Sequence, residues 1–167
     1  MTALQRRVQG LLDRAAAIPA STSNRVAGLF VALPTSIVLG LASWLTPAPE
    51  GVGTHQQLGM AGCTMLTFTG WPCPMCGMTT TFTHLAHFHP WEAAVTQPFG
   101  LVLFAFTVVF AVAGWADVVT GRGVVQGVLD RVLRRERLVA SLLLAGMLLG
   151  WLYKSMRMHP AFFGIAG

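Results

Sequence analysis

Three cysteines lie close together in the middle of this sequence, and thiols are among the few side chains that both bind soft metals and exchange disulfides. Cys73 and Cys76 lie in a Cys-Pro-x-Cys-Gly unit, with Pro72 and Pro74 on either side of the first cysteine. Cys63 lies ten residues upstream. Three histidines follow the unit closely: His84, His87 and His89. The sequence therefore concentrates its candidate chemistry in one short segment.

One interpretation of this segment is a dithiol that is oxidised and reduced. Cys73 and Cys76 have the C-x-x-C spacing of redox motifs, and a helix beginning near Met75 would stabilise a thiolate through its free N–H groups and its dipole. No βαβ pattern of the thioredoxin type surrounds the motif. A structural disulfide, or thiols that are simply buried, explains the same residues.

A second interpretation is a metal site. Cys63, Cys73 and Cys76, together with one of His84, His87 or His89, offer four ligands for Zn²⁺, or for copper in a softer site. The histidines do not have the spacing of a common zinc motif, and an amphipathic helix whose imidazoles face lipid headgroups accounts for them equally. The sequence leaves open whether any cofactor is bound.

The composition indicates that these residues belong to an integral membrane protein. Only 10% of the 167 residues are charged and 54% are hydrophobic, whereas soluble domains carry about 25% charged residues. The formal net charge is +5, but the basic residues lie beside apolar segments. The positive-inside rule explains that pattern, and nucleic-acid binding is not expected.

We expect an all-α membrane protein with three transmembrane helices, at residues 26–45, 99–119 and 138–153. The third segment is short, so Arg137 and Lys154 are expected to extend from its ends toward the headgroups. Residues 58–88 would form a surface or re-entrant segment that is broken at Pro72–Pro74. Residues 1–25, 26–155 and 156–167 would be an N-terminal segment, the membrane domain and a tail.

Two further stretches have the pattern of amphipathic helices that lie on a membrane surface, at residues 1–17 and 123–137. Arginines precede the first span, and others fill residues 122–137, which would bind anionic lipids. Placing both basic clusters in the cytoplasm puts the N-terminus inside and Cys63, Cys73 and Cys76 outside, with residues 156–167 also outside.

The cysteine segment resembles the signature of a family of small bacterial membrane proteins, domain of unknown function 2752. The matching core is Thr69, Gly70, Cys73, Pro74, Cys76, Gly77 and Thr79. Similarity extends to the segment from His89 to Pro98 and to Gly150-Trp-Leu-Tyr-Lys154. Thr80 departs from the pattern, because the family has arginine there. The resemblance implies a multi-pass protein of a bacterial plasma membrane and carries no activity.

The leading prediction is an accessory or assembly subunit of a larger membrane complex, with a membrane-protein partner, rather than an enzyme. So short a chain, with few polar residues in its spans, is poorly suited to transport on its own. The alternatives are a dithiol oxidoreductase of the outer face, using Cys73 and Cys76, and a membrane protein that binds zinc or copper.

Overall fold

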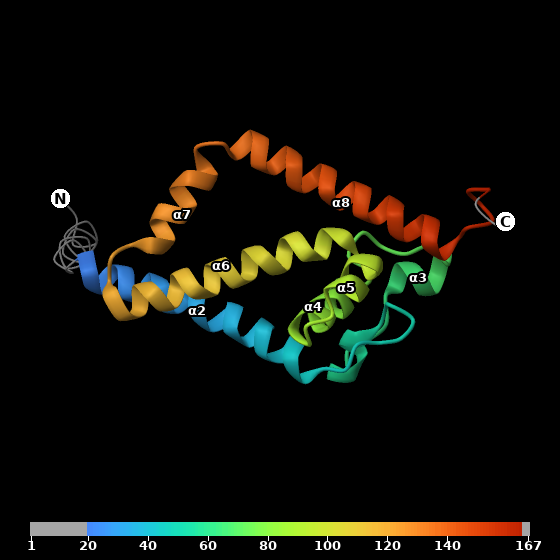
Figure 1. The fold of residues 1–167 in the computed structure, drawn as a ribbon, viewed down its shortest axis with the longest axis horizontal. Helices are drawn as coiled ribbons and strands as arrows, with labels where there is room; N and C mark the ends of the chain where they lie inside the picture. Colours follow the sequence, from blue (N-terminus) through green and yellow to red (C-terminus); the bar gives the residue numbers. More distant parts are fainter. Residues whose placement is uncertain (1–19, 165–167) are drawn as a thin grey trace, which may run out of the picture.

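The protein is all-helical in a computed structural model that describes residues 20–164 (Figure 1). These residues form seven α-helices and one short 3-10 helix. In chain order they are α2 (Ala20–Trp44), η1 (Thr54–Leu58), α3 (Thr64–Thr69), α4 (Met78–Ala86), α5 (Pro90–Thr96), α6 (Pro98–Thr120), α7 (Val124–Leu133) and α8 (Glu136–Met158). The amphipathic helix predicted at residues 1–17 lies outside the described residues.

Three of the helices, α2, α6 and α8, are long and apolar enough to cross a membrane. They contain 25, 23 and 23 residues. At about 1.5 Å per residue, each exceeds the ~30 Å hydrocarbon core of a bilayer. The all-α fold with three candidate spans is thus confirmed, and it indicates a multi-pass membrane protein.

The third span is predicted at residues 138–153, and the helix that carries it extends beyond this range at both ends. Helix α8 continues to Met158, so it needs no long basic side chain to reach the headgroups. Lys154 lies four residues before that end and is only 5% exposed, because it packs inside the protein. Its role has to be sought among its neighbours rather than in lipid.

Small residues allow α2 and α6 to pack closely. A Cβ atom added to Gly114 of α6 would lie 2.8 Å from the backbone nitrogen of Ala32 and 2.9 Å from the carbonyl oxygen of Gly28. Both of these belong to α2. Such close approach of backbones is the usual basis of helix association in membranes, where apolar side chains gain nothing by leaving lipid.

The connection from α6 to α7 is fixed by Asp117, which is fully buried near the end of α6. Its two carboxylate oxygens accept the backbone N–H groups of Val124 and Val125, at 2.6 and 2.8 Å. These N–H groups open α7 and have no partner within that helix. Of the helix predicted at residues 123–137, residues 124–133 are helical as α7, whereas Glu136 and Arg137 begin α8. A buried acid within α6 caps the start of α7.

Helices α3, α4 and α5 lie between the end of α2 and the start of α6, at the same end of the molecule as the close of α8 (Figure 1). Thr80, Thr81 and Thr83 of α4 are fully buried. Helix α8 returns to this end along α6, where Phe99 of α6 packs against Gly146 and Gly150. The cysteine segment is enclosed by elements from both halves of the sequence.

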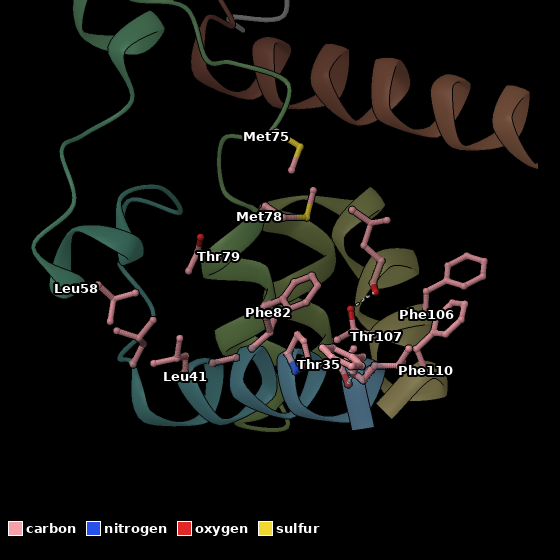
Figure 2. A pocket seen from close by; sticks show the side chains of 17 residues that line it. Thr35, Leu41, Leu58, Met75, Met78, Thr79, Phe82, Phe106, Thr107 and Phe110 are labelled. Atoms are coloured by element: carbon pink, nitrogen blue, oxygen red, sulfur yellow. Dashed lines mark hydrogen bonds between the residues drawn. The ribbon is translucent and has the colours of Figure 1, made fainter. Parts of the chain in front are cut away.

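A largely apolar groove of about 710 Å³ runs between α2, α4 and α6 (Figure 2). Phe82 of α4 and Phe110 of α6 line it, and Met75 and Met78 lie at the end nearest the cysteine segment. Its lining includes hydroxyl groups from Thr35, Thr79 and Thr107.

Candidate metal centre

The three cysteines come together although they belong to separate stretches of the chain. Cys63 immediately precedes α3, while Cys73 and Cys76 lie in the turn that precedes α4. Their Sγ atoms all lie within 4.8 Å of one another. The thiol of Cys73 donates a hydrogen bond to Sγ of Cys76 at 3.2 Å, and none of the three forms a disulfide. Three potential thiolate ligands therefore converge at one point.

The turn between Cys73 and Cys76 presents both sulfurs on the same side. The backbone N–H of Cys76 donates to the carbonyl of Cys73 at 3.0 Å, and the N–H of Cys73 donates to Sγ of Cys76 at 3.2 Å. Gly77 then adopts a φ of 88°, in the left-handed region that favours glycine. Helix α4 consequently begins at Met78 rather than near Met75, so Cys76 lies before its first turn.

A cavity of about 620 Å³ adjoins the cysteines. Besides Cys63, Cys73 and Cys76, its lining includes the polar side chains of Glu50, His55 and Gln56. Met75, Met78 and Thr79 line this cavity and also the apolar groove between α2, α4 and α6. The thiols are accessible to a small solute from one side.

The thiols of Cys63 and Cys76 differ in acidity because their surroundings differ. The backbone N–H of Leu66, in the first turn of α3, stabilises the Cys63 thiolate and lowers the pKa of Cys63 from 9.0 to about 7. Burial raises the pKa of Cys76 from 9.0 to about 12. In the metal-free protein at neutral pH, Cys63 therefore loses its proton before Cys76, which keeps its proton.

The last turns of α8 hold the cysteine segment in place. The indole N–H of Trp151 donates to the carbonyl of Pro72 at 2.7 Å, and the hydroxyl of Tyr153 donates to the carbonyl of Val95 at 3.0 Å. Just past the helix, Nε2 of His159 lies 2.9 Å from the carbonyl oxygen of Gly70. The contacts of Trp151 and His159 attach the backbone on the N-terminal side of Cys73 to the end of the third candidate span, and the contact of Tyr153 attaches α5 to it.

Lys154 lies on the same part of α8 and reaches the other side of the cysteine turn. Its Nζ donates to the carbonyl of Gly51 at 3.0 Å and to the carbonyl of Thr96 at 3.3 Å. A Cβ atom added to Gly77 would lie 3.3 Å from this Nζ and 2.9 Å from the oxygen of Gly51. The ammonium group and the backbone after Cys76 are in close contact.

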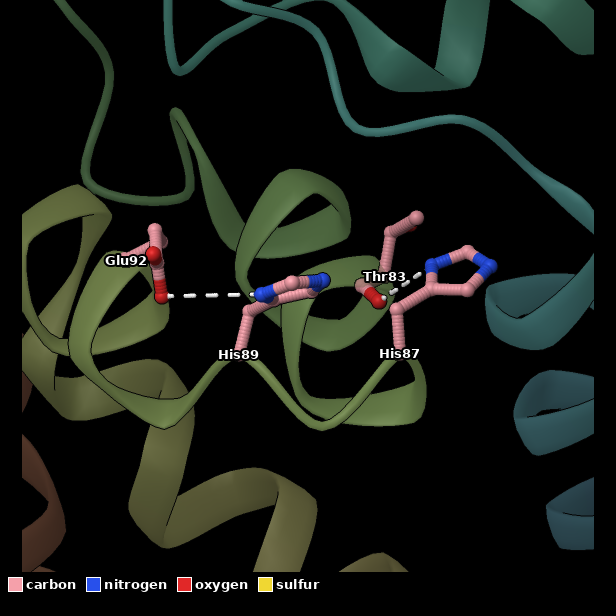
Figure 3. A network of polar contacts seen from close by, with 4 residues as sticks. All are labelled: Thr83, His87, His89 and Glu92. Carbon is pink, nitrogen blue, oxygen red and sulfur yellow. Dashed lines mark hydrogen bonds and ion pairs between the residues drawn. The ribbon is translucent and has the colours of Figure 1, made fainter.

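The structure does not bring the predicted histidine ligands to the cysteines. His84 lies in the last turn of α4 and His87 just follows it, whereas the cysteines lie before its first turn. Figure 3 shows His87 beside Thr83, whose carbonyl is 3.0 Å from Nδ1, and His89 facing Glu92 at 3.9 Å. Within residues 20–164, the group of potential metal ligands at this centre contains only the three cysteines.

Sequence reasoning missed two residues that the fold places near the cysteines. His55 lines the cavity, although it precedes Cys63 in a segment that reads as a loop. The sequence predicts that Lys154 extends toward the lipid headgroups. Its position near the cysteines depends on the long-range packing of α8, which the sequence does not show. Thr80, where the family pattern has arginine, is fully buried and lies 2.8 Å from Thr54 through the two hydroxyl oxygens.

Comparison with known proteins agrees with the resemblance that the motif suggested. The family model described as "Protein of unknown function (DUF2752)" matches residues 63–111. The matched segment begins at Cys63 and contains all three cysteines, α3, α4, α5 and the first part of α6. Comparison with curated proteins gave no match, and comparison with solved structures gave none. The similarity to this family is therefore confined to residues 63–111, which carry the cysteine centre.

Proposed function

We propose that the protein is a membrane-bound accessory protein that binds a soft metal ion, Zn²⁺ or Cu(I), through the thiolates of Cys63, Cys73 and Cys76. One observation carries this proposal: the three sulfur atoms lie within 4.8 Å of one another, beside a cavity that a small ion can enter. Thiolates are the ligands that zinc and Cu(I) prefer.

The spacing of the sulfurs supports a shared ion. Around a tetrahedral zinc with Zn–S bonds of about 2.3 Å, neighbouring sulfurs are roughly 3.8 Å apart. The observed spacing is 3.2 Å for Cys73 and Cys76 and at most 4.8 Å for the pairs with Cys63. The first value lies within 1 Å of the ideal spacing and the second is an upper limit about 1 Å above it, so small rotations of the side chains suffice to reach it.

The ion would have one position left for another ligand. His55 and Glu50 line the same cavity but lie outside the group of three sulfurs, so water is the simplest fourth ligand. A centre with three protein ligands and one open position can pass its ion to another protein or receive one from it. This property fits an accessory or assembly role.

The spans support an accessory role rather than independent transport. Among the described residues, the buried charged side chains are Asp117 and Lys154. Each is engaged with backbone groups, Asp117 at the start of α7 and Lys154 at Gly51 and Thr96. Neither lines the cysteine cavity or the apolar groove. We therefore propose a membrane-protein partner that receives or supplies the ion.

The distribution of arginines supports a plasma-membrane orientation with the N-terminus in the cytoplasm and the cysteine centre outside. In this orientation the exposed residues Arg131, Arg134 and Arg135 would contact anionic lipids of the inner leaflet. Reporter fusions at Pro49 and Gly121 test the orientation. A periplasmic signal is expected from the first and a cytoplasmic signal from the second, and a cytoplasmic signal at Pro49 contradicts the proposal.

Metal binding can be tested on the full-length protein, purified in mild detergent, reduced and freed of metal. Titration with Co²⁺ should give a sulfur-to-cobalt charge-transfer band that saturates at one equivalent and is displaced by Zn²⁺. Cys63→Ala, Cys73→Ala and Cys76→Ala should each weaken the band strongly. His84→Ala and His87→Ala serve as controls and should leave it unchanged. Wild-type affinity in all three cysteine variants would remove the proposal.

A dithiol oxidoreductase remains the second candidate, because the 3.2 Å between the sulfurs of Cys73 and Cys76 also suits disulfide formation. Intact-mass analysis of protein isolated without reductant separates the two functions. Reduced thiols with a retained ion favour the metal centre. A mass lower by two hydrogens, with no ion, favours the dithiol.

A further inference from the structure

Lys154 is a buried cation without an acidic partner among the described residues. It is 5% exposed, and its Nζ donates only to the carbonyl oxygens of Gly51 and Thr96. The single ion pair found in residues 20–164 joins His89 to Glu92, in another part of the structure. An ammonium group has three N–H donors, so one donor and the full positive charge remain without a partner.

Burying such a charge is unfavourable unless an opposite charge lies near it. Neither the nearest charged residue along the chain nor the acid beside Gly51 supplies one. Arg157, one turn further along α8, carries the same sign and is exposed. Glu50 precedes Gly51 but is exposed and forms no ion pair with Lys154.

The cysteine centre is a source of negative charge next to the backbone that this ammonium group contacts. Nζ is in contact distance of the position that a Gly77 side chain would occupy, and Gly77 directly follows Cys76. Lys154 and Cys76 are also close enough to interact electrostatically. Three thiolates carry three negative charges, and an ion bound to them offsets only part of that charge.

We infer that the Lys154 ammonium is the countercharge of the metal–thiolate complex, and that it favours the complex with the larger negative charge. This inference rests on the proposed metal-binding function. Three thiolates with Zn²⁺ carry one negative charge, and three thiolates with Cu(I) carry two. The ammonium therefore stabilises the Cu(I) complex more than the zinc complex. Lys154 is a positioning residue here, since it acts on the ion through the charge of the cysteines.

The ratio of the Cu(I) affinity to the Zn²⁺ affinity tests this inference directly. Both ions bind the same metal-free protein, so the free-energy cost of ionising the thiols is common to both affinities and cancels in the ratio. The ratio also cancels any general loosening of the cysteine turn, which would weaken both ions alike. A residue with a merely structural role would leave the ratio unchanged.

The two affinities are measured by competition with chelators of known affinity, on full-length protein in detergent. Lys154→Met and Lys154→Gln both remove the charge, and the glutamine keeps a donor for the carbonyl of Gly51. Each should lower the ratio by roughly tenfold, the effect of one unit charge about 10 Å away at an effective dielectric constant of about 20. Lys154→Arg keeps the charge and should keep the ratio.

Arg157→Met is the matched control, because it removes the same formal charge from an exposed position on the same helix. Solvent and salt screen that charge, so the ratio should change little. A ratio within twofold of wild type in both neutral Lys154 variants overturns the inference and leaves metal binding intact. A wild-type protein that binds neither ion overturns both.

Discussion

Trp151 near the end of α8 donates its indole N–H to the carbonyl oxygen of Pro72, at 2.7 Å, across 79 positions of the sequence. Pro72 directly precedes Cys73 and is buried. This bond joins the third candidate span to the turn that carries two of the three cysteines. The geometry of the cysteine centre therefore depends on how α8 is docked.

Replacing Trp151 by Phe should loosen the cysteine turn. The substitution keeps an aromatic ring but removes the indole donor, so the half-buried carbonyl of Pro72 loses its partner, at a cost of about 1 kcal/mol. We expect a lower melting temperature in detergent and weaker binding of Co²⁺. Trp115→Phe is the matched control, because the indole of Trp115 donates to Ser36 at 2.9 Å, within the spans. Trp115→Phe should leave the cobalt affinity unchanged. If Trp115→Phe and Trp151→Phe lowered that affinity equally, the role of the Trp151 hydrogen bond at the cysteine centre would be contradicted.

Gly77→Ala should disrupt the cysteine centre more than Gly59→Ala does. Gly77 has a φ of 88°, and a Cβ atom there would lie 2.9 Å from the carbonyl oxygen of Gly51. Gly59 has a φ of 76° with no atom within 4 Å of an added Cβ. Both variants incur the backbone strain of about 1–2 kcal/mol, but only Gly77→Ala also displaces a neighbour. Comparing the melting temperatures and the cobalt stoichiometries of the two variants isolates the effect of this clash. A larger decrease of either quantity in Gly59→Ala than in Gly77→Ala would contradict it.

Alkylation of the metal-free, reduced protein should depend on pH in a site-specific way. The Cys63 pKa of about 7 lies below the ordinary 9.0, so the reactive thiolate of Cys63 forms as pH rises through about 7. Cys76, with a pKa of about 12, stays protonated throughout the neutral range. Peptide mapping after brief exposure to iodoacetamide should show Cys63 half-maximally reactive near pH 7 and Cys76 protected. The rise in alkylation near pH 7 should be absent in Cys63→Ser. If alkylation of the wild-type protein instead rose in a single step near pH 9, the described surroundings of Cys63 and Cys76 would be contradicted.

Asp117→Ala should destabilise α7 without affecting the cysteines. It leaves the N–H groups of Val124 and Val125 unpaired at the start of the helix, and the loss of such a cap costs about 2 kcal/mol. Hydrogen exchange should accelerate in residues 124–133, less so for Asp117→Asn, which retains one acceptor oxygen. Asp130→Ala, at an exposed position of α7, is the control. Unchanged exchange in Asp117→Ala would refute the capping role.

The spans and α7 were predictable because they depend on local patterns. An uncharged run such as residues 26–45 is visible in the sequence whatever surrounds it, and so is the apolar stripe of α7 that includes Val125. The short distance between Cys73 and Cys76 follows from their spacing. These features require no knowledge of how distant segments pack.

The surroundings of the centre were not predictable in the same way. His84 and His87 are close to the cysteines in the sequence, but α4 carries them to its opposite end. Lys154 is far away in the sequence and approaches through the docking of α8. Sequence distance along a helix is a poor guide here, because a nine-residue helix separates its ends by roughly 13 Å.

The central claim is that Cys63, Cys73 and Cys76 bind one ion together, and X-ray absorption at the zinc edge of the zinc-loaded protein tests it most directly. The account predicts three sulfur neighbours at about 2.3 Å and one lighter neighbour, with two sulfurs remaining in Cys63→Ser. If the zinc ion in wild-type protein were coordinated by only two sulfurs, or by nitrogen and oxygen alone, the claim would be contradicted.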